Sequence, residues 1–204
     1  MIEQKFKNKK AILMASGPSL TEKVIEQIRP HKDRFIIFGC NDIYKVVDYL
    51  DVHYACDTAW WNMWGEHIKK LRPSLESWTQ CKPSSEKYKI NHVQGQHKPK
   101  LSINQNEIHY GSNSGYQQLN LAFLMGCSRF ILVGYNMKKI NNKSHYFGDH
   151  PKELKRNSPY PRFVSAFATI QPEIRELIIN CTPDSALTMF EQKPLEEILN
   201  DVIY

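Results

Sequence analysis

The segment AILMASGPSLTEK, residues 11–23, decides the fold that the rest of the sequence must fit. A short apolar run ends abruptly at Ser16-Gly17-Pro18-Ser19, and residues 20–28 then carry apolar side chains at helical spacing. A strand that passes through a tight turn into a helix is typical of the start of a βαβ unit. Gly17 permits a positive φ or a close approach of the backbone to a ligand, and Pro18 stiffens the turn.

The same alternation continues along the chain. Helical patterns at 43–50, 60–71, 116–125, 162–177 and 194–202 alternate with strand-like runs at 34–38, 52–56, 129–133 and 178–181. We therefore predict an α/β, Rossmann-like fold, with a mostly parallel sheet covered by helices on both faces, in a single nucleotide-binding domain over residues 1–204. Residues 73–110 lack a clear period and are interpreted as an insertion or a small hairpin region. Residues 136–161 are expected to form a lid loop, because loops longer than about 12–15 residues in compact domains are usually functional or disordered.

The composition limits the class of protein. The chain has 204 residues, 41% of them hydrophobic, and a net charge of +6, which suits a globular domain with an anionic ligand. No apolar run approaches the roughly 20 residues that span a bilayer, and the charged start of the chain lacks a signal-peptide pattern. We therefore expect a cytoplasmic protein with no membrane partner. The five cysteines are scattered without a CxxC pair, which argues against a disulfide framework and a zinc site. The charge permits a nucleic-acid partner without requiring one, and oligomerisation is left open.

Two corners of small residues are the first candidate site. Ser19 and Glu22 form an S-x-x-E capping box, which is expected to start the first helix and to turn its amides and dipole toward an anion. The segment Ser112-Asn113-Ser114-Gly115 precedes the helix at 116–125, and Ser114 with Gln117 forms a second capping box. Because the carboxyl ends of parallel strands meet at one edge, the two corners are expected side by side, around the phosphate of a nucleotide. For the first corner alone, a simple packing turn is an equally good interpretation.

Polar residues follow the next two strands as well. Asn41 comes after the second strand and Asp57 after the third, and each could hydrogen-bond a ribose or base or cap the helix that follows. The tryptophans at 60, 61 and 64 could stack on a sugar or base, but a place in the core is the favoured interpretation.

The long loop after residues 129–133 has the densest set of reactive groups. It contains Ser144-His145-Tyr146-Phe147-Gly148-Asp149-His150-Pro151. A histidine suits general base catalysis on a hydroxyl, so His150 and His145 are candidates, and Asp149 could orient an imidazole or a metal. The pair lacks an HExxH pattern and a third ligand, so we predict no protein-held metal site. The other candidate nucleotide contacts of this region are Asn136, Tyr146, Lys152 and Arg156.

The motifs GPSL, CN, NSGY, FILVGYNM, HYFGDHP and CTPDSAL occur in this order along the chain, and the ordered set resembles that of a known protein family. They resemble small phage and prophage proteins of the hydroxymethylpterin diphosphokinase-like domain family. More distantly, the order is similar to that in the bacterial sialyltransferases that use CMP-sialic acid, which have a GT-A variant fold. The resemblance covers most of the chain outside roughly 73–110.

The sialyltransferase likeness implies a nucleotide-binding fold that works without a metal. It implies nucleotide contacts from Gly17, Ser19, Asn41 and Ser114, and Asp57 stands where that family has an asparagine.

It also implies that His150 is the general base. His145 could hold this role, because Asp149 adds one residue between Gly148 and His150. Tyr146 and Tyr160 are candidates for the phosphate-binding tyrosines of that family. The diphosphokinase likeness instead implies ATP with magnesium, which Asp57 and Asp149 would suit, and transfer of diphosphate to a pterin alcohol.

These inferences leave three functions open. The first is a nucleotide-dependent transferase, above all a glycosyltransferase that moves a sugar from a CMP- or UDP-type nucleotide-sugar to a hydroxyl acceptor, with a modified phage DNA base as one acceptor. Magnesium is permitted but not required there. The second is an ATP- and magnesium-dependent diphosphokinase acting on a pterin-like alcohol. The third is a non-catalytic nucleotide-binding protein.

Overall fold

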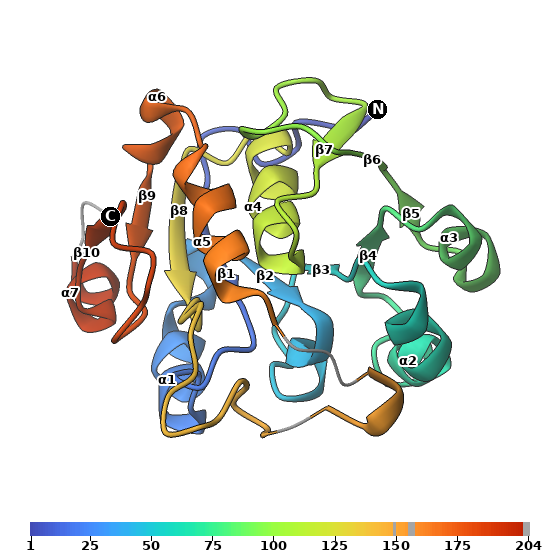
Figure 1. Ribbon diagram of the computed structural model, residues 1–204, viewed down its shortest axis with the longest axis horizontal. Coiled ribbons are helices and arrows are strands. Elements are labelled where there is room, and N and C mark those ends of the chain that lie inside the picture. The colour runs from blue at the N-terminus through green and yellow to red at the C-terminus, as the bar shows by residue number, and fades with distance from the viewer. Residues whose placement is uncertain (149, 155–157, 202–204) are drawn as a thin grey trace.

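The computed structural model describes residues 1–148, 150–154 and 158–201, and its centre is a parallel sheet (Figure 1). In the described part of the chain the strand order is β10-β9-β8-β1-β2-β3-β4-β5, and every neighbouring pair is parallel. The strands are β1 (Lys10–Met14), β2 (Ile36–Cys40), β3 (Val52–Tyr54), β4 (Glu76–Thr79), β5 (Asn91–His92), β8 (Arg129–Val133), β9 (Ile178–Asn180) and β10 (Glu191–Gln192). The predicted α/β fold with a parallel sheet is confirmed.

Helices cover both faces of this sheet. The longer ones are α2 (Thr58–Leu71), α4 (Ser114–Leu124) and α5 (Tyr160–Ala168), and the shorter ones are α1 (Glu22–Ile28), α3 (Lys82–Tyr88), α6 (Pro172–Arg175) and α7 (Leu195–Asn200). Three 3₁₀ segments of the described chain are η1 (Arg29–Arg34), η2 (Asn41–Lys45) and η3 (Lys152–Leu154). The helix expected over 43–50 is only the short η2. The helix expected over 162–177 is divided in two, because Pro172 keeps the preceding Gln171 extended, with ψ 138°.

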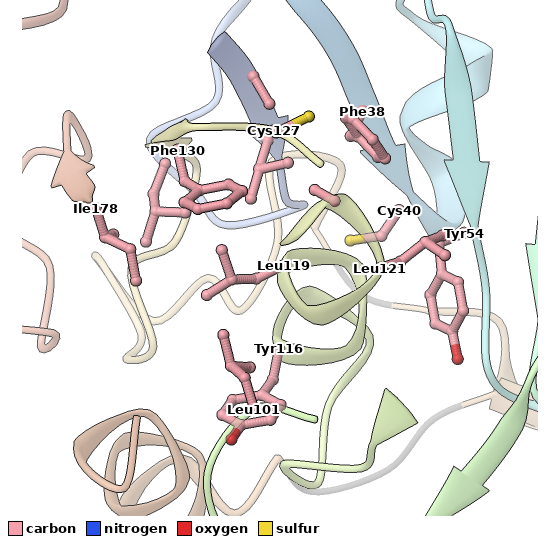
Figure 2. Close-up of a cluster of buried hydrophobic side chains, with 14 of the residues drawn as sticks. Phe38, Cys40, Tyr54, Leu101, Tyr116, Leu119, Leu121, Cys127, Phe130 and Ile178 are labelled. Carbon is pink, nitrogen blue, oxygen red and sulfur yellow. The ribbon is translucent and has the colours of Figure 1, made fainter. Parts of the chain in front are cut away.

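Alternate side chains of β1 reach two separate cores. Ala11 and Leu13 pack with α4 and α5 on one face, whereas Ile12 and Met14 pack with α1 and α7 on the other. Figure 2 shows part of the first core, where Leu119 of α4 lies close to Phe130 of β8. The strand is buried on both faces, as a central parallel strand requires, and its carboxyl end is thereby held in one position.

A third core lies at the end of the sheet that carries α2 and α3. Trp60 and Trp61 are buried there and pack edge to face, with ring centroids 4.9 Å apart. The core interpretation of these two tryptophans is therefore confirmed. All five cysteines are free and buried, in agreement with the sequence.

The prediction of an insertion or hairpin at residues 73–110 is wrong. β4 extends the main sheet, with Val52 paired in parallel to Glu76, and β5 follows at the edge. A separate pair, β6 (Gln94–Gln96) and β7 (Glu107–His109), is also parallel and not a hairpin. These strands are two to four residues long and partly polar, so they carry too little apolar alternation to be recognised.

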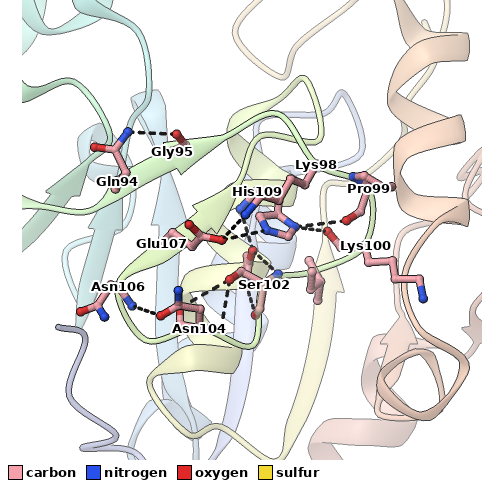
Figure 3. A network of polar contacts seen from close by, with 12 residues as sticks. Gln94, Gly95, Lys98, Pro99, Lys100, Ser102, Asn104, Asn106, Glu107 and His109 are labelled. Atoms are coloured by element: carbon pink, nitrogen blue, oxygen red, sulfur yellow. Dashed lines mark hydrogen bonds and ion pairs between the residues drawn. The ribbon is translucent and has the colours of Figure 1, made fainter.

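The connection between β6 and β7 is held by the polar network in Figure 3. Lys98 donates to the Glu107 carboxylate at 2.8 Å, which holds the pKa of that carboxyl below its usual value. The His109 ring donates through Nδ1 to the Lys100 carbonyl at 2.9 Å. Asn120 of α4 accepts from the backbone N–H of His109 at 2.9 Å, which ties the segment to the sheet-covering helix.

Within the described residues, none of the helices has the length and apolar content needed to cross a bilayer.

Candidate functional site

A cavity of about 690 Å³ lies where β1, β2, β3 and β8 end. Its wall is made by the residues that follow these strands, by the start of α4, by the long loop after β8 and by the first turn of α5. Figure 1 shows that α4 and α5 both begin at this edge of the sheet. The predicted side-by-side placement of the two corners is therefore found. The candidate residues that line the cavity are Gly17, Pro18, Asn41, Asp57, Ser112, Asn113, Ser114, Gly115, Asn136, His145, His150 and Tyr160.

Some candidates lie elsewhere. Ser19, Tyr146 and Lys152 are not part of the cavity wall, and Lys152 is an exposed residue of η3. Asp149 and Arg156 lie outside the described residues.

The first corner is locked to the end of β8. The Gly17 N–H donates to the Gly134 carbonyl at 2.9 Å, and a Cβ on Gly17 would lie 2.2 Å from that carbonyl oxygen. The Ser19 N–H and hydroxyl both donate to Asn136 Oδ1, at 3.1 and 2.8 Å. The close approach that glycine permits is therefore to another strand end, and these amides are not available to a phosphate.

The expected capping box at this corner is wrong. α1 begins at Glu22, and its N-cap is Thr21, whose side chain accepts from the Val24 N–H at 3.3 Å. The Ser19 hydroxyl is occupied by Asn136, 117 residues away in sequence, so it cannot cap the helix. The packing interpretation of the first corner explains its geometry, and the corner contributes a wall of the cavity.

The second corner, unlike the first, has backbone N–H groups that are available to a ligand. Asn113, and not Ser114, is the N-cap of α4, because its Oδ1 accepts from the Tyr116 N–H at 2.8 Å. The Ser114 hydroxyl lies 3.1 Å from the Cys56 thiol. In the described chain, no acceptor contacts the backbone N–H of Ser114 or Gly115. These amides begin a helix of 11 residues at the cavity wall, so dipole and donors together favour an anion there.

The loop after β8 is docked over the first corner. The Tyr146 N–H donates to the Ser16 carbonyl at 3.0 Å, and the Tyr146 hydroxyl donates to the Asp42 carbonyl at 3.2 Å. Burial raises the pKa of this phenol, so it stays a neutral anchor. The structure gives Tyr146 a structural role and does not support the expected phosphate contact.

Two histidines of this loop face the cavity together. The ring centroids of His145 and His150 are 4.4 Å apart, and Phe147 stacks on His145 at 5.0 Å with nearly parallel rings. Ser16 Oγ lies 3.3 Å from His145 Nδ1, which orients that ring from the end of β1. An imidazole held at a cavity wall is placed to accept a proton from a bound hydroxyl.

Asn41 is held in place by a buried histidine. His53 of β3 donates through Nε2 to the Asn41 carbonyl at 2.9 Å, and Asn41 adopts a positive φ of 52°. Burial lowers the pKa of His53 from 6.5 to about 4, so the ring is neutral at pH 7.

His53 should make the protein less stable in mild acid. The unfolded chain takes up a proton on this ring below pH 6.5, but the folded chain does not until about pH 4. The contribution of His53 is therefore fully present above pH 6.5 and is lost as the pH falls toward 4, by about 3 kcal/mol in total. We expect His53→Gln to flatten the loss of stability between pH 7 and pH 4.5, measured by urea unfolding. The exposed His92→Gln is the control, and an unchanged profile for His53→Gln would contradict the assignment.

Sequence reasoning missed several residues of the cavity wall. Gln80 follows β4 and would have been found if β4 had been recognised as a sheet strand. His97 directly follows β6 and Tyr110 directly follows β7, and the centroids of their rings are 4.3 Å apart. Lys138 and Arg162 carry no local motif that distinguishes them from other surface cations.

The comparisons with known proteins fit this geometry. The model of the family described as 6-hydroxymethylpterin diphosphokinase MptE-like matches residues 1–142. The chain belongs to the MptE-like family. Its fold is similar to that in the structure of the MAf glycosyltransferase from Magnetospirillum magneticum AMB-1, with a TM-score of 0.63 and 12% identity. The likeness covers 95% of this chain and 35% of that one, so the MptE-like chain spans about a third of the glycosyltransferase. No curated protein matches. The printed names of the family and of this structure each describe an enzyme that transfers a chemical group.

Proposed function

We propose that this MptE-like chain is a nucleotide-dependent transferase that moves a sugar from a nucleotide-sugar to a hydroxyl acceptor. The observation that carries the proposal is one cavity, with the unoccupied amide donors of Ser114 and Gly115 and with two histidines in its wall. The glycosyltransferase fold of the structural neighbour supports sugar transfer.

The chemistry follows from these two groups. The phosphate of the donor binds at the start of α4, where the amides and the helix dipole stabilise the charge that grows on the leaving nucleotide. His150 or His145 accepts the proton of the acceptor hydroxyl as its oxygen bonds to the sugar carbon. The bond between that carbon and the phosphate oxygen breaks, and the nucleotide leaves with the electron pair. Asn41 and Asp57 line the same cavity and are suited to the ribose or base.

The α4 amide can be tested with a single substitution. Ser114 is the first residue of the helix, and Asn113 before it is extended, with φ −155° and ψ 155°, so Ser114→Pro fits the backbone and removes one N–H. We expect Ser114→Pro to weaken binding of CMP or UDP by about 10- to 100-fold, since a hydrogen bond to a charged group is worth about 1.5–3 kcal/mol. Isothermal titration calorimetry measures this effect.

Two controls make that result specific. Ser114→Ala keeps the amide and is expected to bind nucleotide as the natural chain does. The free nucleosides cytidine and uridine, which lack phosphate, should bind Ser114→Pro and the natural chain equally. Unchanged CMP and UDP affinity in Ser114→Pro would contradict a phosphate at this helix.

A diphosphokinase is the second candidate, because the family description names that activity. Magnesium in such sites is held by one or two carboxylates together with the substrate phosphates. Asp57 is the carboxylate among the described residues of the wall, and it could supply one ligand to magnesium. The described chain has no cluster of three metal-binding side chains. The bound ion would neutralise the ATP phosphates. Turnover of ATP that is abolished by EDTA and by Asp57→Asn would favour this candidate, whereas EDTA-resistant sugar transfer would favour the first.

A further inference from the structure

Two aromatic residues line the cavity from the segments that follow β6 and β7. His97 directly follows β6 and Tyr110 directly follows β7, and both belong to the cavity wall. Their ring centroids are 4.3 Å apart, and the ring planes meet at 66°. Phosphate binding at α4 and proton transfer to a histidine use neither ring, so the pair is available for another part of the ligand.

Tyr110 is fixed in place by the chain around it. Its backbone N–H donates to the Gln96 carbonyl at 3.0 Å, and its carbonyl accepts from Gln117 Nε2 at 2.9 Å. The ring lies against Gly95, where a Cβ would be 2.2 Å from Tyr110 Cε1, so only glycine leaves room for the ring in this position. A half-buried ring held in this way loses little conformational freedom when a second flat ring packs on it.

Tyr110 and the loop histidines are held by different strands of the sheet. Gln117, which holds Tyr110, accepts from the Tyr54 hydroxyl of β3 at 2.6 Å. His145 is instead oriented by Ser16, which follows β1. β1 and β3 are two positions apart in the sheet, which corresponds to about 10 Å. The aromatic pair and the histidines therefore lie toward different ends of the cavity.

The start of α4 contacts the sheet between these ends. Ser114 Oγ lies 3.1 Å from the Cys56 thiol after β3, and the Gly115 carbonyl accepts from the Tyr135 hydroxyl after β8 at 3.1 Å. A phosphate at the α4 amides thus has the histidines toward one side and the aromatic pair toward the other. A nucleotide-sugar has the same order, because its phosphate joins the reacting sugar carbon to the nucleoside.

We propose that Tyr110 and His97 bind the base of the donor nucleotide by stacking, so that the nucleoside lies toward β6 and β7 and the sugar lies at the histidines. The inference rests on the proposed function and gives the bound donor a direction. Stacking on an aromatic side chain tolerates any base, because every base has a flat π face. Asp57 and Gln80, which follow β3 and β4, line the cavity on the same side and offer acceptors to the ribose or to the edge of the base.

Tyr110→Ala tests the stack by isothermal titration calorimetry with CMP, UMP and AMP. We expect each nucleotide to bind about 5- to 150-fold more weakly, the range that loss of one stacking ring causes. Ribose 5-phosphate, which lacks a base, should bind Tyr110→Ala and the natural chain equally. Tyr110→Phe keeps the ring and is expected to bind all three nucleotides as the natural chain does. Tyr49→Ala, at a half-buried tyrosine that does not line the cavity, is the matched control.

Gly95→Ala is a second variant, and it replaces Tyr110→Ala if that variant does not fold. The added methyl group would displace the far end of the Tyr110 ring without removing it. Nucleotide affinity should therefore fall, while the affinity for ribose 5-phosphate should stay unchanged.

Unchanged nucleotide affinity in Tyr110→Ala, together with the loss expected for Ser114→Pro, would overturn the stack and leave the proposed function standing. An equal loss of ribose 5-phosphate affinity would also overturn it, because that compound has no base. Cytidine, uridine and adenosine separate the remaining cases. If these nucleosides bind the natural chain more tightly than Tyr110→Ala, and the nucleotides bind no better than the nucleosides, the stack stands and the proposed phosphate site fails. If neither nucleosides nor nucleotides bind the natural chain, both proposals fail.

Discussion

Replacing both His145 and His150 with alanine is expected to slow sugar transfer by about 10²- to 10⁴-fold, the range that a positioned general base contributes. The double variant is the decisive one. The two rings are 4.4 Å apart, so either could accept the proton when the other is removed. Release of nucleotide from the donor with water as the acceptor, followed by chromatography, measures the rate without knowledge of the natural acceptor.

Nucleotide affinity separates catalysis from binding in this variant. Because the proposed phosphate contacts lie at the start of α4, the double variant should bind CMP or UDP as the natural chain does. His92→Ala is the control, since His92 is an exposed residue of β5 that does not line the cavity. Undiminished transfer by the double variant would eliminate the histidine base. Tight binding by the natural chain without turnover of any donor would favour the non-catalytic nucleotide-binding protein.

Gly17→Ala is expected to destabilise the fold by roughly 4 kcal/mol or more, among the largest effects of a single substitution. The added Cβ would lie 2.2 Å from the Gly134 carbonyl oxygen and 2.4 Å from Asn136 Oδ1. The first of these is a backbone atom at the end of the central strand β8, and it cannot turn away as a flexible side chain can. The strand ends would have to separate, with loss of the Gly17–Gly134 hydrogen bond. Urea unfolding measures the change.

Gly148→Ala is the matched control for this substitution. Gly148 has a positive φ of 90°, but a Cβ there would meet nothing within 4 Å. The cost is then only that of the backbone conformation, about 1–3 kcal/mol. A Gly17→Ala variant as stable as Gly148→Ala would show that the two strand ends are not rigidly packed.

Much of the fold could be predicted because it depends on local patterns. The apolar run of β8 and the helical spacing of α4 are long enough to be recognised, and a parallel sheet brings their ends to one edge whatever the remaining details. The same rule predicts that Asn41 and Asp57 lie at this edge, and both line the cavity.

The helix caps show why local patterns fail within the site. Ser19 and Ser114 each have the spacing of a capping box, yet Thr21 and Asn113 are the caps that form. Ser19 donates to Asn136 after β8, and Ser114 meets Cys56 after β3. The side chain of each serine contacts a residue that is distant in sequence and comes close only in the folded chain.

The sequence by itself determined the class of fold, the edge of the sheet that carries the site and the loop that carries the histidines. Only the tertiary structure decided which corner keeps its amides unoccupied, that β4 and β5 extend the sheet, and that Arg162 lines the same cavity as Ser112. The physical reason is the range of the forces involved. Hydrophobic periodicity is set by near neighbours along the chain, whereas hydrogen-bond competition and uncompensated charge depend on residues that are distant in sequence and adjacent in space.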